Sequence, residues 1–328
     1  MLSRVAEGLF WMSRYVERME NIARLLDLGR RMDALPTREN APLSEWTSVV
    51  IASGCSESFP HDLKTEANMA TVADHLIRDE GNPSSIAACI HATRANAKAM
   101  RIALSSEVWE AVNQTSSELR QQLQMNRDQE NLTAFLDWVR GRAAIIRGTI
   151  SGTLLRDQGY GFIELGKWFE RADATARLLD VKYHVLLPSV TDVGGGLDYL
   201  QWTQILRAAN STRSFRHIYR RSVDPEGVID LLVLNSKSPR SLLMAIRNIY
   251  HELSMIALPE DPKQQVVLAK IRGRYTQLMD LTVDEIFSIG LHEWLTDFIV
   301  STNLYASETA DVFGFGAPAT QSQDQNSQ

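Results

Sequence analysis

The sequence predicts an all-α protein made of two tandem, internally duplicated helical bundles. Hydrophobic residues recur at helical spacing through the long segments, and Val5, Leu9 and Met12 begin one such series. The alternating β-branched runs that would predict strands are almost absent. A charged segment, ERMENIARLLD at residues 17–27, recurs as ERADATARLLD at residues 170–180, so the two copies lie 153 residues apart. The sequence leaves open whether a pseudo-twofold axis relates the two bundles.

The repeat continues beyond these segments at a spacing of 156 residues. Trp46 corresponds to Trp202, and the stretch 58–61 (SFPH) corresponds to 214–217 (SFRH). Further on, 82–85 (NPSS) corresponds to 238–241 (SPRS). The change of spacing needs only three additional residues, which the glycines at 194–196 can supply, because loops absorb insertions at low cost.

The repeat also predicts the domain boundaries. Residues 1–150 are expected to form the first half and residues 151–313 the second, with the junction between Gly148 and Gly161. The tail at 314–328 is rich in Ala, Gln, Ser and Asn and is expected to be disordered.

Local signals predict where single helices begin and end. In 82–85 and 238–241 we expect Asn or Ser to cap a helix whose first residue is Pro, and residues 224–226 (DPE) have the same form. Continuous helices are expected over 131–147, 242–256, 263–281 and 286–310.

Composition excludes several classes of protein. The formal net charge of −6 gives no basic field for nucleic acid. No run of about 18 uncharged apolar residues predicts a membrane span, and Arg4 and Glu7 interrupt any signal peptide. Cys55 and Cys89 have no zinc-ligand spacing, which favours a reducing, cytoplasmic setting. We expect neither a metal nor a cofactor.

The charges of the repeated segment persist although most other positions differ between the copies. An exposed ion pair on a helix stabilises it by only a few tenths of a kcal/mol, so solvated charges tolerate replacement. We therefore favour a buried or interface network, while a ligand or catalytic site and an ordinary solvated face remain alternatives. Within the first copy, Arg14 with Glu17 and Glu20 with Arg24 have pairing spacing. The candidate residues are Arg14, Glu17, Arg18, Glu20, Arg24, Lys167, Glu170, Arg171, Asp173 and Arg177.

These segments resemble the alpha-E domain family, bacterial all-helical proteins of unknown function. The resemblance rests on 14–24 (RYVERMENIAR), its second copy at 167–177, the helix start at 82–86 and the run at 104–113, and it extends to about residue 313. Genes of this family usually lie beside an ATP-grasp-type ligase and a transglutaminase-like cysteine peptidase. The resemblance therefore implies a system that makes, modifies or trims amide-linked peptides, and it supplies no catalytic residue.

Aromatic and histidine residues at equivalent repeat positions are secondary candidates. His61 and His217 could act as a base, but packing against the neighbouring Phe is favoured. Trp46 and Trp202 could form pocket walls, although core packing is favoured. The basic residues Arg207, Arg213, Arg216, Arg220 and Arg221 could meet an acidic partner or form a solvated face.

Motifs of well-known enzymes are missing from the sequence. A di-iron bundle would need Glu-x-x-His, which does not occur. The three glycines at 194–196 lack the Lys-Ser/Thr of a phosphate loop, and no Gly-x-Ser-x-Gly is present.

Three hypotheses of function therefore remain. The favoured one is a non-catalytic or scaffold component that binds the ligase or peptidase and presents a peptide. The second is an enzyme acting on amide or ester bonds with Glu17/Arg24 and Glu170/Arg177 in a cleft. The third is a module that binds a small molecule or peptide.

Overall fold

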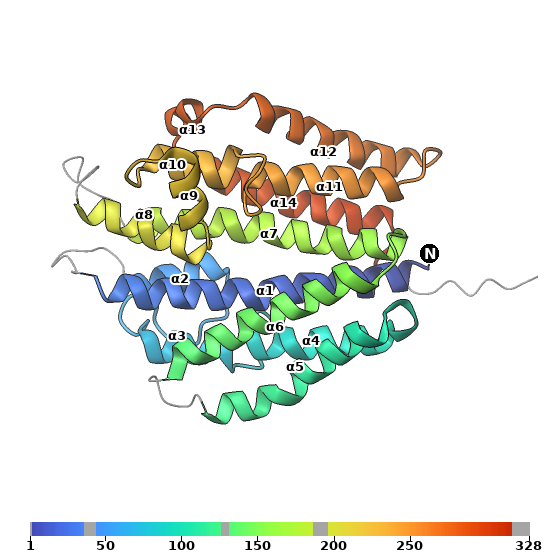
Figure 1. The fold of residues 1–328 in the computed structure, drawn as a ribbon, viewed down its shortest axis with the longest axis horizontal. Helices are drawn as coiled ribbons and strands as arrows, with labels where there is room; N and C mark the ends of the chain where they lie inside the picture. Colours follow the sequence, from blue (N-terminus) through green and yellow to red (C-terminus); the bar gives the residue numbers. More distant parts are fainter. Residues whose placement is uncertain (1, 36–43, 126–130, 186–195, 317–328) are drawn as a thin grey trace, which may run out of the picture.

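Two long helices run side by side through the middle of the molecule and contain the two charged segments. The computed structural model describes residues 2–35, 44–125, 131–185 and 196–316, and within these the regular structure is all helical with no strand, as expected. Helix α1 (Ser3–Asp33) packs along α7 (Gln158–Val185) (Figure 1). The other helices lie on either side of this central pair.

The helices of each side follow one another in the chain. On the α1 side are α2 (Glu45–Ser53), α3 (Met69–Ile77), α4 (Ile86–Ala99), the 3-10 turn η1 (Arg101–Ala103), α5 (Ser106–Met125) and α6 (Leu132–Thr153). On the α7 side are α8 (Gly196–Ala208), α9 (Thr212–Tyr219), α10 (Pro225–Ile229) with the π-helical turn η4 (Asp230–Leu234), α11 (Leu242–Ile256), α12 (Pro262–Asp280), α13 (Val283–Ile289) and α14 (Leu291–Val312).

The two sides share one core. Helices α4 and α6 pack on α1, and α11 and α14 pack on α7. Two helices cross over, because α2 also packs on α7 and α8 also packs on α1. The buried apolar side chains form one continuous cluster that includes residues of both sides, such as Phe10 and Phe169.

Glycines allow the central helices to approach their neighbours closely. A Cβ atom at Gly166 of α7 would lie within van der Waals overlap of the Phe10 carbonyl oxygen of α1, so any larger residue would push the two backbones apart. Gly8 makes room for Met100 and Gly161 for Ile256 in the same way. These contacts hold α1 and α7 close to each other and to the ends of α4 and α11.

The expected helix starts at 82 and 238 are three residues too early. Helix α4 begins at Ile86 with Ser85 as its cap, and α11 begins at Leu242 with Ser241 as its cap. Asn82 instead forms a turn before the helix, in which its Oδ1 accepts a hydrogen bond from the Ser84 backbone N–H at 2.9 Å. Asp224 caps α10 ahead of Pro225, as expected.

Other boundaries differ from the expectations because of single local features. The helix expected over 286–310 is divided by Gly290, whose φ of 104° is unsuited to an L-residue with a side chain. Helix α6 continues past its expected end at residue 147 to Thr153. The expectations for Gly194 and Gly195 and for the tail beyond residue 316 fall outside the described residues.

We predict that Gly166→Ala destabilises the protein, by about 1–3 kcal/mol, because the new methyl group must displace the α1 backbone at Phe10. The matched control is Gly141→Ala in α6, where no atom lies within 4 Å of the position that the new methyl group would take. That change should stabilise by up to about 1 kcal/mol through helix propensity. Chemical denaturation of both variants measures the difference, and equal effects would contradict the close approach.

Candidate functional site

The charged faces of α1 and α7 meet at the centre of the molecule and are buried there. The Glu17 side chain is 0% exposed, Glu20 is 1% exposed and Glu170 is 5% exposed. A carboxylate removed from water in this way is stable only with cationic and hydrogen-bonding partners. These three carboxylates therefore do not belong to a solvated helix face.

The two helices exchange ion pairs reciprocally. Glu17 accepts from Arg171 at 2.8 and 2.9 Å, and Glu170 accepts from Arg18 at 2.6 and 3.0 Å. Each glutamate is thus bound by the arginine that directly follows the other glutamate. The expected pairing of Arg14 with Glu17 is wrong, because Arg14 Nε donates to Glu170 at 2.8 Å. The geometry resembles a bidentate guanidinium–carboxylate contact, the strongest type of side-chain ion pair.

Glu17 and Glu20 lie among four arginines, and we call these six residues the first cluster. Arg240 Nη2 lies 3.0 Å from Glu20, and Arg147 contacts both Glu20 and Glu17. Arg24 donates to Glu20 within its own helix, as expected, and also to the Ala208 carbonyl at 2.6 Å. The first cluster consists of Glu17, Glu20, Arg24, Arg147, Arg171 and Arg240.

The second cluster surrounds Glu170 and Asp173. Asp173 accepts from Arg177 at 2.7 Å within α7, and from Asn303 Nδ2 of α14 at 2.8 Å. A cavity of about 180 Å³ lies beside these residues. The second cluster consists of Arg14, Arg18, Glu170, Asp173, Arg177 and Asn303.

One candidate from the second copy, Lys167, lies beside the two clusters rather than within them. Lys167 pairs with Glu164 and stacks on Trp168, with its nitrogen 4.5 Å from the ring centre. Burial lowers the pKa of Lys167, against the opposing effect of Glu164. Arg171 also stacks on Trp168, at 4.9 Å, just as Arg14 stacks on Trp11 at 4.8 Å. These indole rings therefore hold the arginines that cross the interface.

Sequence reasoning missed Arg147 and Arg240, which complete the first cluster. Arg147 arrives from α6 and Arg240 from the turn before α11, far from Glu17 in sequence. No spacing rule connects residues so distant. The only available signal was the difference between copies, since Ser84 corresponds to Arg240.

The arginines decide the protonation of the buried carboxylates. Burial alone would raise the pKa of Glu17, but Arg171, then Arg147 and Arg240, hold it far below its ordinary value. Burial likewise opposes Arg18 and Arg14 at Glu170, and the two arginines win, lowering its pKa to about 2. The pKa of Glu20 is also lowered, against burial and the charge of Glu17.

The same environment acts on the cations. Burial, and next the charge of Arg24, lower the pKa of Arg240 to about 9, while Glu20 opposes them. Arg240 therefore still carries its proton at neutral pH. A general acid or base needs a pKa near the working pH, and the buried glutamates are fully ionised there. This arrangement is suited to holding helices together and to binding charge, and unsuited to proton transfer.

The secondary candidates lie away from this interface. Trp46 and Trp202 are each 3% exposed and belong to the core, which agrees with the packing interpretation. The His61 ring packs on Phe59 with a centre-to-centre distance of 5.4 Å, and His217 lies exposed on α9. The basic residues from Arg207 to Arg221 are also exposed.

A buried histidine that sequence reasoning did not single out joins three segments on the α1 side. His75 Nδ1 lies 2.8 Å from Asp79, and its Nε2 lies 3.2 Å from both Ser58 Oγ and Asn82 Nδ2. Asn82 thus competes with Ser58 for the single lone pair of Nε2, which does not suit activation of Ser58 as a nucleophile. The histidine ties the turn at Ser58 and the turn at Asn82 to α3.

The described residues contain no cluster of three or more His, Cys, Asp or Glu side chains that could hold a metal ion. In the same part of the chain, no helix combines the length and apolar character needed to cross a membrane.

Fold and site together define a class of all-helical protein with Glu-Arg pairs exchanged between two central helices. The family model described as a predicted alpha-helical domain with a conserved ER motif matches residues 1–313. The chain belongs to this Alpha-E family. The ER pair occurs at Glu17-Arg18 and again at Glu170-Arg171, the residues that make the reciprocal contacts.

Similar curated proteins carry no assigned function. Uncharacterised proteins of Mycobacterium bovis and Mycobacterium tuberculosis are each 24% identical to this chain over 94% of its length. The match covers 36% of each of those proteins, so this chain spans about a third of their length. No solved structure matches the chain significantly.

We predict that Glu17→Gln destabilises the protein by about 3–5 kcal/mol, because the buried guanidinium of Arg171 loses its counter-charge. Glu110→Gln on the exposed face of α5 is the control and should have little effect. Urea unfolding followed by circular dichroism measures both. Similar small effects would show that the charges at the interface are solvated.

We also predict that acid weakens the fold through Glu170. Its folded pKa of about 2 lies below the ordinary 4.5, so its contribution is complete above about pH 5 and is lost as pH falls toward 2. The loss amounts to about 3 kcal/mol across this range. Unfolding free energies measured at several pH values give the slope, which should become shallower in Glu170→Gln; an unchanged slope would contradict the assignment.

Proposed function

We propose that this protein is a non-catalytic binding component that works beside another protein. The observation that carries the proposal is the commitment of every signature glutamate to buried guanidinium groups. Glu17 and Glu170 are ionised and fully paired, so neither is available as acid, base or nucleophile. An enzyme that uses Glu17/Arg24 or Glu170/Arg177 as catalytic groups is therefore the less favoured alternative.

The length of the relatives supports a role next to another domain. In the mycobacterial proteins the matching region accounts for 36% of a longer chain. A region joined covalently to a longer polypeptide is suited to acting on, or with, its neighbour, because linkage raises the effective concentration of the two parts.

The partners that we propose follow from the family resemblance. They are an ATP-grasp-type ligase and a transglutaminase-like peptidase of a system that makes or trims amide-linked peptides. The protein would bind one of these enzymes and present a peptide. The free, buried cysteines Cys55 and Cys89 suit a reducing compartment, and we propose the cytoplasm.

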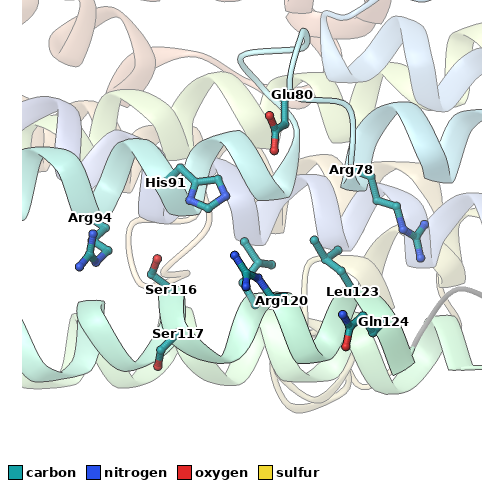
Figure 2. A pocket seen from close by; sticks show the side chains of 10 residues that line it. Arg78, Glu80, His91, Arg94, Ser116, Ser117, Arg120, Leu123 and Gln124 are labelled. Carbon is teal, nitrogen blue, oxygen red and sulfur yellow. The ribbon is translucent and has the colours of Figure 1, made fainter.

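A basic groove between α4 and α5 is the surface that we propose for an acidic segment of such a partner or peptide. The groove has a volume of about 710 Å³, and the basic side chains Arg78, His91, Arg94 and Arg120 line it together with Glu80. Figure 2 shows His91 and Arg94 on one helix and Arg120 on the facing helix, on opposite sides of the gap. Arg120 makes no ion pair with any described residue, so its charge is available to a ligand.

We further propose that the two sides of the molecule derive from one duplicated unit. Equivalent residues make equivalent contacts. Gly8 packs on Met100, and Gly161 packs on Ile256, at spacings of 153 and 156 residues from the first pair. The helix α6 that supplies Arg147 packs on α1, and α14, which supplies Asn303 at a spacing of 156, packs on α7. The reciprocal Glu–Arg contacts have the form that a pseudo-twofold axis would produce.

We predict that Arg120→Glu weakens capture of the ligase or peptidase about tenfold or more. The new carboxylate in the groove would repel the acidic segment that we propose to bind there. Arg272→Glu on the exposed surface of α12 makes the same charge change elsewhere and should leave capture unchanged. Surface-bound protein titrated with each purified enzyme at low and physiological salt measures the effect.

Circular dichroism of both variants confirms that they fold. If neither enzyme binds the unaltered protein, the proposed function is wrong. If both charge changes weaken capture equally, the groove is not the docking surface.

A further inference from the structure

The two charge clusters differ at two positions that the repeat makes equivalent. At a spacing of 156 residues, Ser84 corresponds to Arg240, and Asn303 corresponds to Arg147. Arg240 and Arg147 belong to the first cluster, and Ser84 and Asn303 lie at the second. In the first cluster both arginines reach the carboxylates, with Arg240 3.0 Å from Glu20. A serine and an asparagine are far shorter, so they leave space that the arginine side chains fill on the other side.

That space is the cavity of about 180 Å³ beside Glu170 and Asp173. Ser84 and Asn303 both line it. A water molecule takes about 30 Å³ of liquid volume, so the cavity admits a small group rather than a whole drug-sized ligand. The remaining lining comes from α1, the end of α2, and α7.

The carboxylates differ in how much of their accepting capacity is used. Glu20 Oε1 accepts two hydrogen bonds from Arg24 and one from Arg240, and its Oε2 forms an ion pair with Arg147. Among the described residues, Asp173 accepts only from Arg177 and Asn303. Asp173 therefore retains positions for a donor of the kind that Arg240 provides to Glu20.

One further group at the cavity suits a cationic donor. The C-terminal end of α2, at Ala52 to Gly54, lines it, and the last carbonyls of a helix carry partial negative charge. Asn21 also lines the cavity, is 8% exposed, and has an Nδ2 without a hydrogen-bond partner. That Nδ2 is a donor and suits an acceptor, whereas a half-turn of the amide would present its oxygen to a donor.

We propose that this cavity binds a guanidinium group, such as the side chain of an arginine, at the position that Arg240 occupies in the first cluster. Bound there, the group gives the second cluster the same numbers of guanidinium groups and carboxylates as the first. Arg14, Arg18, Arg177 and the ligand make four guanidinium groups around two carboxylates. The first cluster shows that this protein accommodates such a set in buried surroundings.

An anion is the competing occupant, because three arginines exceed two carboxylates around the cavity. The probes therefore include both signs of charge. Isothermal titration calorimetry uses agmatine as the guanidinium probe and citrulline as a relative of arginine whose urea side chain is uncharged. Acetate and inorganic phosphate are the anions. A blocked peptide with one central arginine distinguishes a peptide side chain from a free small molecule.

We expect agmatine to bind and citrulline to bind at least about tenfold more weakly, since a charge-assisted hydrogen bond is lost. Ser84→Arg should fill the cavity with the chain's own guanidinium and abolish binding, while Asp173→Asn should weaken it about tenfold. Ser254→Arg, on the exposed surface of α11, is the matched control and should bind agmatine normally.

Thermal unfolding of Ser84→Arg reports whether that variant folds, and Asp173→Asn provides the test if it does not. Absence of agmatine binding, retention of binding in folded Ser84→Arg, or binding of acetate or phosphate in place of agmatine would each overturn the proposal. Binding of the peptide assigns the guanidinium to a protein side chain, and binding of agmatine alone assigns it to a small molecule. The titration contains no partner enzyme, so its outcome is separate from that of the capture experiment.

Discussion

The structure depends on the exchange of buried Glu–Arg pairs between α1 and α7. Transferring one carboxylate from water into the interior is costly, and an arginine on the facing helix compensates for it only at the right position. Glu17 with Arg171 and Glu170 with Arg18 therefore fix how the two central helices lie along each other. Gly166 permits the close approach that these contacts require. The outer helices then pack on this pair, and α6 and the turn before α11 add their own arginines to it.

The two clusters combine one requirement with two outcomes. In both, a glutamate lies beneath guanidinium groups and is held ionised. The first cluster is completed entirely by the chain, through Arg147 and Arg240. The second has shorter side chains at the equivalent positions and a cavity beside its carboxylates. In the proposed account, the shorter side chains turn a structural charge network into a binding site, while the signature glutamates stay the same.

The sequence predicts the helices well because their stability comes from apolar residues at a local period of 3.6. The C-terminal end of α11 at Ile256 was predicted to the residue, although its start was expected three residues too early. The sequence also predicts the ion pair of Glu20 with Arg24, because the spacing of two residues within one helix sets that contact. The rest depends on tertiary packing. The partner of Arg14 is Glu170, which is 156 positions away. The local sequence around Arg14 does not indicate that it pairs with Glu170 rather than with Glu17. Asn82 contacts His75 of α3, and α4 begins after this turn, at Ile86, with Ser85 as its cap.

The coupling energy between Glu17 and Arg171 tests the central claim most directly. A double-mutant cycle with Glu17→Gln and Arg171→Met compares the free energies of unfolding of the two single variants and the double variant. If the pair is buried and mutually compensating, the double variant is more stable than the sum of the single effects predicts, with a coupling of about 2–3 kcal/mol. A coupling of about 0.5 kcal/mol or less, as found for exposed ion pairs, would contradict the account.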